Sequence, residues 1–212
     1  MPRLSLLAFL ILAIPSLCAA QSTEARSHAD RGLELAHSGD ITSAESELRK
    51  AVKLEPNNPE FLSALGTLLA MQKKLEESTT VFRKALQFAP ADLTSRRYLA
   101  ANLWQLHRYG EAKHELEIIL RQRPDDAPSR LLLGMVSENS GDYATAAKML
   151  SSVPQEVEKQ PESIAALASS YYHLNERGKA RAALERLSSL RAIKPVLLGA
   201  QIADHEIGRA HV

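Results

Sequence analysis

The sequence predicts an all-α solenoid in which pairs of antiparallel helices repeat along the chain. Two sets of small residues recur every 34 residues. The first set is Gly32, Gly66, Ala100, Gly134 and Ala168, and the second is Ala44, Ser78, Ala112, Ala146 and Ala180. Small residues in phase on a helical background indicate that two helices approach closely at the same place in every unit. Repeats of this length stack into solenoids, which usually present a binding surface rather than a catalytic site.

Turns and links divide the chain into five units, each with a helix A, a tight turn, a helix B and a short link. The units cover residues 25–58, 59–92, 93–126, 127–160 and 161–194. Prolines in the links, such as Pro56 and Pro90, should stop helix B because proline pushes the preceding residue out of the helical region. Polar residues that follow these prolines should cap the next helix A, and they are Asn58, Asp92 and Asp126.

These units resemble the tetratricopeptide repeat (TPR) family. Its pattern has large residues at repeat positions 7, 11 and 24, small residues at 8 and 20, alanine at 27 and proline at 32. The second unit matches all seven positions with Leu65, Gly66, Leu69, Ser78, Phe82, Ala85 and Pro90. The other units keep most of the pattern, so the resemblance covers nearly all of the chain after residue 20. It implies a right-handed superhelix of antiparallel helix pairs.

Two departures from the pattern predict local differences. Arg31 replaces a large apolar residue in the first unit, which fits a terminal repeat with one face in water. Pro154 comes about one turn early in the fourth unit, so helix B should be shorter there. Residues 155–160 should then form a looser connector or a separate turn.

Residues 1–20 are predicted to be a signal peptide. Arg3 precedes an apolar run at residues 4–14, Pro15 ends the run, and small residues follow at Ala19 and Ala20. The expected cut lies between Ala20 and Gln21, and it places the protein in the periplasm or outside the cell. A lipoprotein signal at Cys18 is less favoured because Leu17 stands where a small residue is usual. No later apolar run is long enough to span a membrane.

The end of the chain has two further segments. Residues 195–205 match the opening of a sixth unit that is not completed, since Pro195 lies one period after Pro161. Residues 206–212 are expected to be foreign, because their back-translation resembles a sequencing-adapter oligonucleotide; the alternative is a natural tail. If the first interpretation holds, the natural protein continues beyond His205.

Composition excludes several classes of function. The chain has 26 Lys and Arg against 25 Asp and Glu, and removal of residues 1–20 takes away Arg3 alone, so the remaining net charge is zero. A neutral chain lacks the basic face that nucleic acid requires. The scattered histidines lack metal-ligand spacing and are expected to be solvated, and no catalytic motif or phosphate-binding loop is present. Asp125 and Asp126 are better explained by helix capping than by a cation site. We therefore predict no enzyme activity, metal or cofactor.

The resemblance to the TPR family implies a concave binding surface formed by helix A positions 2, 5, 9, 12 and 13. The strongest candidates at these positions are Trp104, Arg97, Met71, Met135, Tyr172, Gln105, Asn139 and His37. Others on the same predicted face are Leu33, Ser63, Thr67, Ala101, Leu131, Glu138, Ser169 and His173. Trp, Tyr and Arg are common at binding hot spots, and Met makes adaptable surfaces. Trp104 either anchors a ligand or packs on the adjoining helix A.

The predicted function is non-catalytic binding of a protein or peptide in this groove. The lysine and asparagine with which one TPR subclass grips a C-terminal carboxylate are replaced by Ala29 and Leu33 in the first unit, and by Arg97 and Ala101 in the third. An alternative is that the array is an accessory part of a larger protein, whose missing C-terminal domain is an enzyme or a surface anchor.

Overall fold

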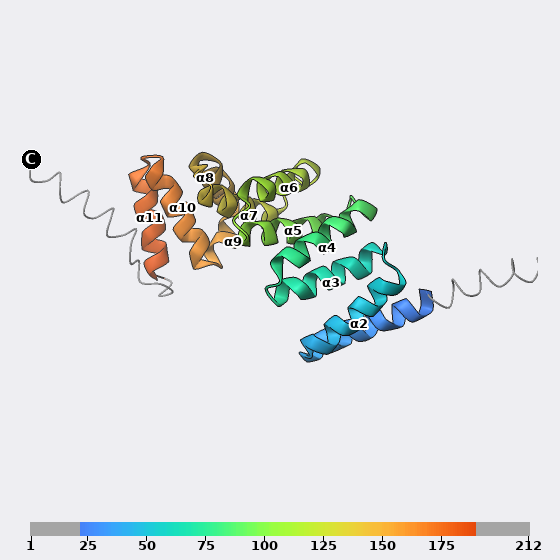
Figure 1. Ribbon diagram of the computed structural model, residues 1–212. Coiled ribbons are helices and arrows are strands. Elements are labelled where there is room, and N and C mark those ends of the chain that lie inside the picture. The colour runs from blue at the N-terminus through green and yellow to red at the C-terminus, as the bar shows by residue number, and fades with distance from the viewer. Residues whose placement is uncertain (1–21, 190–212) are drawn as a thin grey trace, which may run out of the picture. The chain divides into compact units, whose positions relative to one another are not determined.

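The structure, a computed structural model, describes residues 22–189 and places only helices, turns and short links within them (Figure 1). The chain divides into two compact units, one ending at Leu106 and the other beginning at His107. We call them unit 1 and unit 2 and describe each by itself. The predicted all-α architecture is confirmed, since each unit consists of helices that pack in consecutive pairs.

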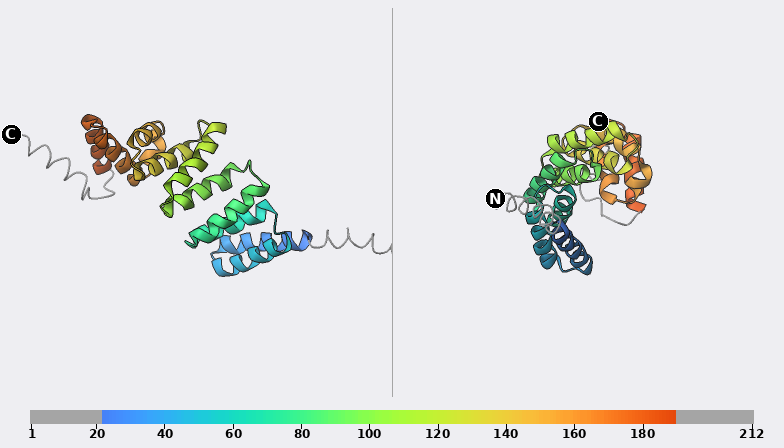
Figure 2. Two further views of the ribbon diagram at one scale, coloured as in Figure 1. Left: turned by 45° about the horizontal axis from the view of Figure 1, so that its top comes forward. Right: turned by 90° about the vertical axis from the view of Figure 1, so that its right-hand side faces the viewer.

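The described part of unit 1, residues 22–106, contains five helices. A first helix at residues 22–38 is followed by α2 (Ile41–Leu54), α3 (Pro59–Met71), α4 (Leu75–Phe88) and α5 (Leu93–Gln105). Successive helices run in opposite directions and lie side by side (Figures 1 and 2). The first helix, α3 and α5 occupy the helix A places of the predicted repeats, and α2 and α4 occupy the helix B places.

Unit 2 follows the same alternation with one insertion. Its helices are α6 (Tyr109–Gln122), α7 (Ala127–Asn139), α8 (Tyr143–Ser151), α9 (Pro154–Glu158), α10 (Pro161–His173) and α11 (Arg177–Ser189). The helix B of the fourth repeat, α8, has 9 residues where α4 and α6 have 14. The expectation drawn from Pro154 is confirmed, because a separate short helix, α9, begins at that proline.

Three of the helix A segments begin with the caps that the sequence predicts. Asn58 accepts hydrogen bonds from the backbone of Glu60 and Phe61 at the start of α3, and Asp92 caps α5 in the same way. Asp126 accepts from the backbone nitrogen of Ser129 at the start of α7. Such caps satisfy N–H groups that the first turn of a helix leaves unpaired.

All five turns between helix A and helix B use a left-handed residue at the same place in the repeat. The residues, with their φ angles, are Gly39 (88°), Lys73 (62°), His107 (59°), Gly141 (80°) and Asn175 (61°), and they lie one period apart. The left-handed backbone conformation is used in tight turns, but it brings the β-carbon close to the following carbonyl oxygen unless the residue is glycine. The turn geometry is therefore common to all repeats, although only two of them use glycine.

Replacing Gly141 by alanine should lower the free energy of unfolding by about 1 kcal/mol, because alanine is strained at positive φ. Gly178→Ala is the matched control. Neither glycine has another atom within 4 Å of the added methyl group, but only Gly141 has a positive φ. Urea denaturation of both variants checks this, and an equal effect of the two substitutions would contradict the assigned turn conformation.

The small residues of the repeat allow helix A and helix B to touch. A β-carbon added to Gly32 would lie 2.8 Å from Leu48 Cγ, and one added to Gly134 would lie 2.5 Å from Leu150 Cγ. At Gly66 the corresponding neighbour is the ring of Phe82, at 3.1 Å. The distances at Gly32 and Gly134 are shorter than packed carbon atoms adopt, and the one at Gly66 is tighter than most, so the large residue of helix B occupies the space of the missing side chain.

Each unit has its own apolar core. In unit 1, Leu48, Leu65 and Leu69 belong to a buried cluster that joins the first helix, α2 and α3. In unit 2, Val157 of α9 belongs to a buried cluster with Leu150 and Ile164. The inserted helix α9 is thus part of the core of unit 2 and not a loose connector.

Ion pairs join helices that lie one repeat apart. Glu45 of α2 accepts hydrogen bonds from Lys74 Nζ, Gln72 Nε2 and Arg49. These donors, of which the Lys74 ammonium has the largest effect, lower the pKa of Glu45 to about 2. The carboxylate is therefore ionised at neutral pH and holds the turn before α4 onto α2.

One prediction about the histidines is wrong. His28, expected to be solvated, is 26% exposed in its side chain and lies 2.5 Å from the carboxylate of the buried residue Glu47. Lys50 first, and His28 second, lower the pKa of Glu47 to about 2. The pair lies between the first helix and α2 and contributes to their packing.

Several expectations concern residues that the structure does not describe. The signal peptide and its cleavage point, the incomplete sixth unit at residues 195–205 and the foreign tail at residues 206–212 lie outside residues 22–189. Across the described part of the chain, every helix is too short or too polar to traverse a bilayer.

Candidate functional site

Unit 1 exposes one continuous face of its helix A segments. The nine residues predicted for the concave surface in this unit are Leu33, His37, Ser63, Thr67, Met71, Arg97, Ala101, Trp104 and Gln105, and none of them is buried. Within each helix these positions are spaced by three or four residues, so they share one side of it. The opposite side carries the core residues, including Leu65 and Leu99. We call these nine residues the inner face of unit 1.

The inner face of unit 1 includes exposed apolar side chains. Leu33 is 44% exposed and Met71 is 63% exposed, and Trp104 is partly buried. Ala101 is also partly exposed, one turn before Trp104. Exposed apolar side chains on one side of a set of helices can receive a partner's apolar groups.

Polar groups on the inner face are connected to one another across neighbouring helices. Ser63 Oγ of α3 lies 2.7 Å from Ser95 Oγ of α5, and Thr67 Oγ1 donates to the carbonyl of Ser63. Lys73 Nζ, in the turn after α3, donates to Gln105 Oε1 at 3.2 Å. The Ser63–Ser95 and Lys73–Gln105 bonds link α3 and the turn after it to α5, and the exposed residues of the face are Leu33, His37, Met71 and Gln105.

The predicted site residues in unit 2 are more involved in packing. Leu131, expected on the exposed face, is 9% exposed and belongs to the same buried cluster as Val157 of α9, so that prediction is wrong. Met135 is partly buried against this cluster. Ser169, also 9% exposed, donates to Glu138 Oε1 at 2.9 Å. The inner surface of this unit therefore offers fewer free groups than that of unit 1.

The remaining candidates in unit 2 lie at the C-terminal ends of α7 and α10. Asn139 is exposed and donates to Glu138 Oε2. The partly buried ring of Tyr172 meets the exposed ring of His173 edge to face, and His173 stacks on Tyr143 of α8 with centroids 4.0 Å apart. Tyr172 is thus held by an aromatic cluster, with only part of its ring available to a ligand.

Sequence reasoning confined the candidates to helix A and missed two exposed aromatic residues. Phe88, the last residue of α4, is 46% exposed. Tyr98 of α5 is 44% exposed and stacks on the buried ring of Phe82 in α4. Phe88 could have been noticed as a large apolar residue at a helix end beside Pro90. No sequence signal marks Tyr98, because its neighbour Phe82 lies in another helix.

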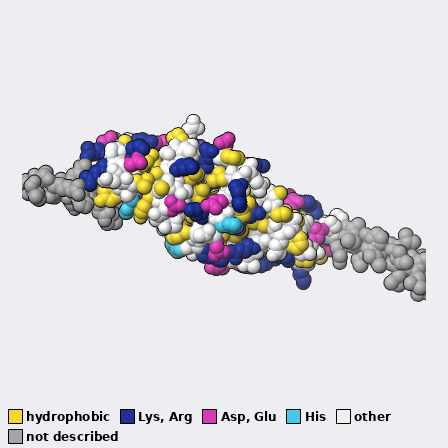
Figure 3. Space-filling model, turned by 90° about the horizontal axis from the view of Figure 1, so that it is seen from above, with side chains coloured by type: hydrophobic (Ala, Val, Ile, Leu, Met, Phe, Trp, Pro, Cys, Tyr) yellow, Lys and Arg dark blue, Asp and Glu magenta, His cyan; other side chains and the backbone are white. Residues whose placement is uncertain are grey.

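The electrostatics of the surface are mixed. On the face seen in Figure 3, Lys and Arg side chains alternate with Asp and Glu. Within residues 22–189, His, Asp and Glu side chains do not gather in groups of three that could hold a metal ion. The Asp125 carboxylate pairs with Arg130 at 2.8 Å, and Asp126 caps α7, which accounts for both acids.

Comparison with known proteins agrees with the paired helices. A family described as Tetratricopeptide repeat matches residues 29–92 and 99–161, more than half of the chain. The chain therefore belongs to the tetratricopeptide repeat family. Among curated proteins, none matches significantly.

Solved structures with a similar fold include three TPR-like chains. MamA from Desulfovibrio magneticus RS-1 is 20% identical, with 79% of this chain and 95% of that chain covered and a TM-score of 0.72. PilF from Pseudomonas aeruginosa is 20% identical over 90% of this chain and 88% of that one, with a TM-score of 0.69. YrrB, a TPR protein with an unusual peptide-binding site, is 18% identical over 85% of this chain and 90% of that chain, with a TM-score of 0.68. At this level of identity the likeness concerns the fold.

Proposed function

We propose that the protein is a non-catalytic scaffold that binds a peptide segment of a partner protein on the inner face of unit 1. The observation that carries the proposal is that Leu33 and Met71 are exposed and Trp104 is partly exposed, on helices that each have a separate buried side. YrrB, which shares the fold, has a peptide-binding site, and TPR proteins generally act as scaffolds.

The surface favours a segment with apolar side chains. Leu33 and Met71 can contact apolar groups, and Met adapts its shape to different partners. The hydroxyls of Ser63 and Thr67 lie on the same face and can accept hydrogen bonds from a peptide backbone. Neither Lys nor Asn stands at the positions with which the carboxylate-binding TPR subclass works, so an internal segment suits the face better than a free C-terminus.

The proposed setting is outside the cytoplasm. The support is the pattern of residues 1–20, in which Arg3 precedes an apolar run and small residues end the segment. N-terminal sequencing of the protein isolated from its native host tests this. A mature N-terminus at Gln21 supports export, and a chain that retains residues 1–20 contradicts it.

Trp104→Ala tests the binding face. Trp104 is expected to anchor the ligand, so truncation should leave the free energy of unfolding within about 1 kcal/mol of wild type and weaken binding by about 2 kcal/mol or more. The ligand is a peptide selected on the wild-type protein from a phage-displayed random library, and affinity is measured by calorimetry. If Trp104 is instead a packing residue, truncation should cost about 3–5 kcal/mol of stability.

Phe88→Ala is the matched control for this experiment. Phe88 is also an exposed aromatic residue of unit 1, but it lies at the end of a helix B and outside the inner face. Its truncation should leave peptide binding unchanged. An equal loss of affinity in both variants, or a stable Trp104→Ala variant with full affinity, would refute the proposal for this face.

A further inference from the structure

The early end of α8 leaves part of unit 2 uncovered. Proline has no backbone N–H, and the residue before it avoids the helical region, so α8 ends at Ser151 and the chain leaves the helical conformation at Val153, with φ −132° and ψ 57°. The preceding helix B, α6, continues to Gln122. The C-terminal half of α6 therefore lies beside a shortened neighbour.

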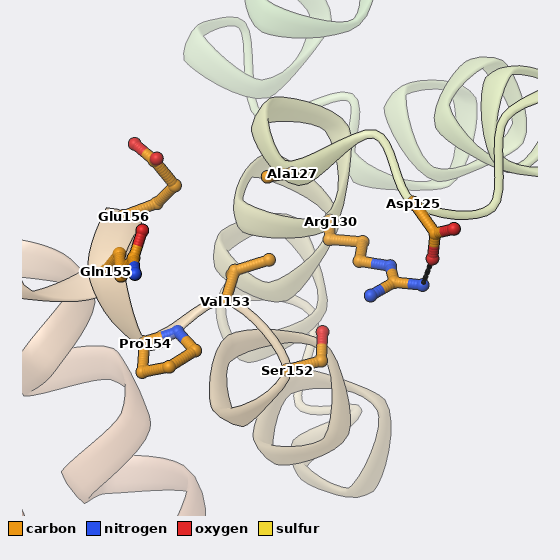
Figure 4. A pocket seen from close by; sticks show the side chains of 8 residues that line it. All are labelled: Asp125, Ala127, Arg130, Ser152, Val153, Pro154, Gln155 and Glu156. Carbon is orange, nitrogen blue, oxygen red and sulfur yellow. Dashed lines mark hydrogen bonds and ion pairs between the residues drawn. The ribbon is translucent and has the colours of Figure 1, made fainter.

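Three adjoining hollows follow this edge of unit 2. The first has a volume of about 420 Å³ and shares Leu120 and Met149 with the second, which has about 320 Å³. The second shares Arg130 and Ser152 with the third, which has about 250 Å³ and is drawn in Figure 4. Since each hollow shares side chains with the next, they form one groove between α6 and α8, which we call the α6–α8 groove.

The floor of the α6–α8 groove is apolar. Leu120 of α6 and Met149 of α8 are partly exposed there, above Leu133 of α7, which is buried. At the third hollow the side chain of Val153 lies between Ala127 and Pro154 (Figure 4). A floor of this kind favours an apolar side chain of a ligand over water.

The middle hollow of the groove is positively charged, although the three linings together hold three cations and three carboxylates. Arg121 and Lys148 are exposed, and neither has a carboxylate within ion-pair distance among residues 22–189. Arg130 is held by Asp125, and Glu117 is the carboxylate at the first hollow. The middle hollow is lined by the cations Lys148 and Arg130 and by no carboxylate. A third acid, Glu156, lines the outer hollow, but Lys159 pairs with it at 3.0 Å.

We propose that the α6–α8 groove is a second docking site, which binds an acidic peptide segment through an apolar side chain placed over Leu120 and Met149 and flanking carboxylates placed beside Lys148 and Arg121. Charge complementarity selects the acidic peptide, because the unpaired cations stand on both sides of the apolar floor. The site is separate from the inner face of unit 1 and does not depend on the function proposed for that face.

The groove is formed before any ligand binds. Lys113 Nζ of α6 pairs with Asp142 at 2.8 Å, and Asp142 also caps α8 by accepting from the backbone of Thr145. The Lys113 ammonium, and then the Thr145 donors, lower the pKa of Asp142, so the link persists at neutral pH. One end of the groove is thereby fixed, which reduces the entropy lost on binding.

The probe for this site is a fluorescein-labelled peptide of sequence EELLEE, measured by fluorescence anisotropy at low ionic strength. Two other labelled peptides, KKLLKK and EESSEE, separate the charge requirement from the apolar requirement. EELLEE should bind at least about tenfold more tightly than either, a difference of about 1.4 kcal/mol. Equal binding of EELLEE and KKLLKK, or of EELLEE and EESSEE, would overturn the proposal.

Variants then locate the binding site. Lys148→Glu should weaken EELLEE binding by about tenfold or more, and Met149→Ser should weaken it with little change in the melting temperature. Arg177→Glu is the matched control, because Arg177 is an exposed residue of α11 outside the groove and its replacement makes the same charge change. An equal loss in Lys148→Glu and Arg177→Glu would show that the attraction is unspecific and would overturn the proposal.

Two further measurements distinguish other occupants. Trp104→Ala should leave EELLEE binding unchanged, and a loss in that variant would place the peptide on the inner face of unit 1 instead. Sedimentation should show whether the wild-type protein self-associates and whether Lys148→Glu abolishes that association; we expect that it does not. If it does, the groove is filled by a second copy of the chain, and the acidic peptide is not its ligand.

Discussion

Phe82→Ala is expected to lower the free energy of unfolding by about 3–5 kcal/mol. The Phe82 side chain is fully buried, its ring lies against Gly66, and Tyr98 stacks on it with centroids 5.8 Å apart. Truncation leaves a cavity between α3, α4 and α5, which these neighbours cannot close because Gly66 has no side chain. Urea denaturation followed by circular dichroism measures the loss.

Phe88→Ala is the control for this prediction too. Phe88 is in the same helix as Phe82 but is 46% exposed, so its truncation should cost less than about 0.5 kcal/mol. A small effect of Phe82→Ala, or similar effects of the two substitutions, would show that the contact between helix A and helix B at Gly66 is not the one described.

Ala44→Leu is expected to cost about 1–3 kcal/mol, because it forces three extra carbon atoms into a closed contact. Ala44 has no exposed surface, and its carbonyl oxygen would lie 3.2 Å from a β-carbon on Gly32, so the helices already touch there. The melting temperature, measured by circular dichroism, should fall accordingly.

Ala182→Leu provides the matched comparison. Ala182 also lies on a helix B, α11, but it is exposed, so a larger side chain meets no neighbour there. This variant should melt close to wild type. If Ala44→Leu were equally harmless, the 34-residue phase on which the repeats are aligned would be incorrect.

Features that depend on a few neighbouring residues could be predicted from the sequence. The caps at Asn58 and Asp92 act through backbone groups two or three residues away, and Pro154 ends α8 through its own ring and missing N–H. The 34-residue phase of small residues likewise indicated where paired helices touch, because every repeat places the same contact at the same position. These rules are local or periodic, so they can be read without knowing which helices meet.

Which of the predicted surface residues remain available depends on how the helices pack. Leu131 and Met71 both occupy predicted binding positions, yet Leu131 is buried in a cluster that includes Val157, while Met71 is 63% exposed. His28 and Glu47 form a pair although no motif joins them. The α6–α8 groove is likewise a feature of the packed structure, because its floor brings Leu120 and Met149 together from different helices. Such features arise from contacts between segments far apart in the sequence, and their burial and charge balance exist only once those segments have packed.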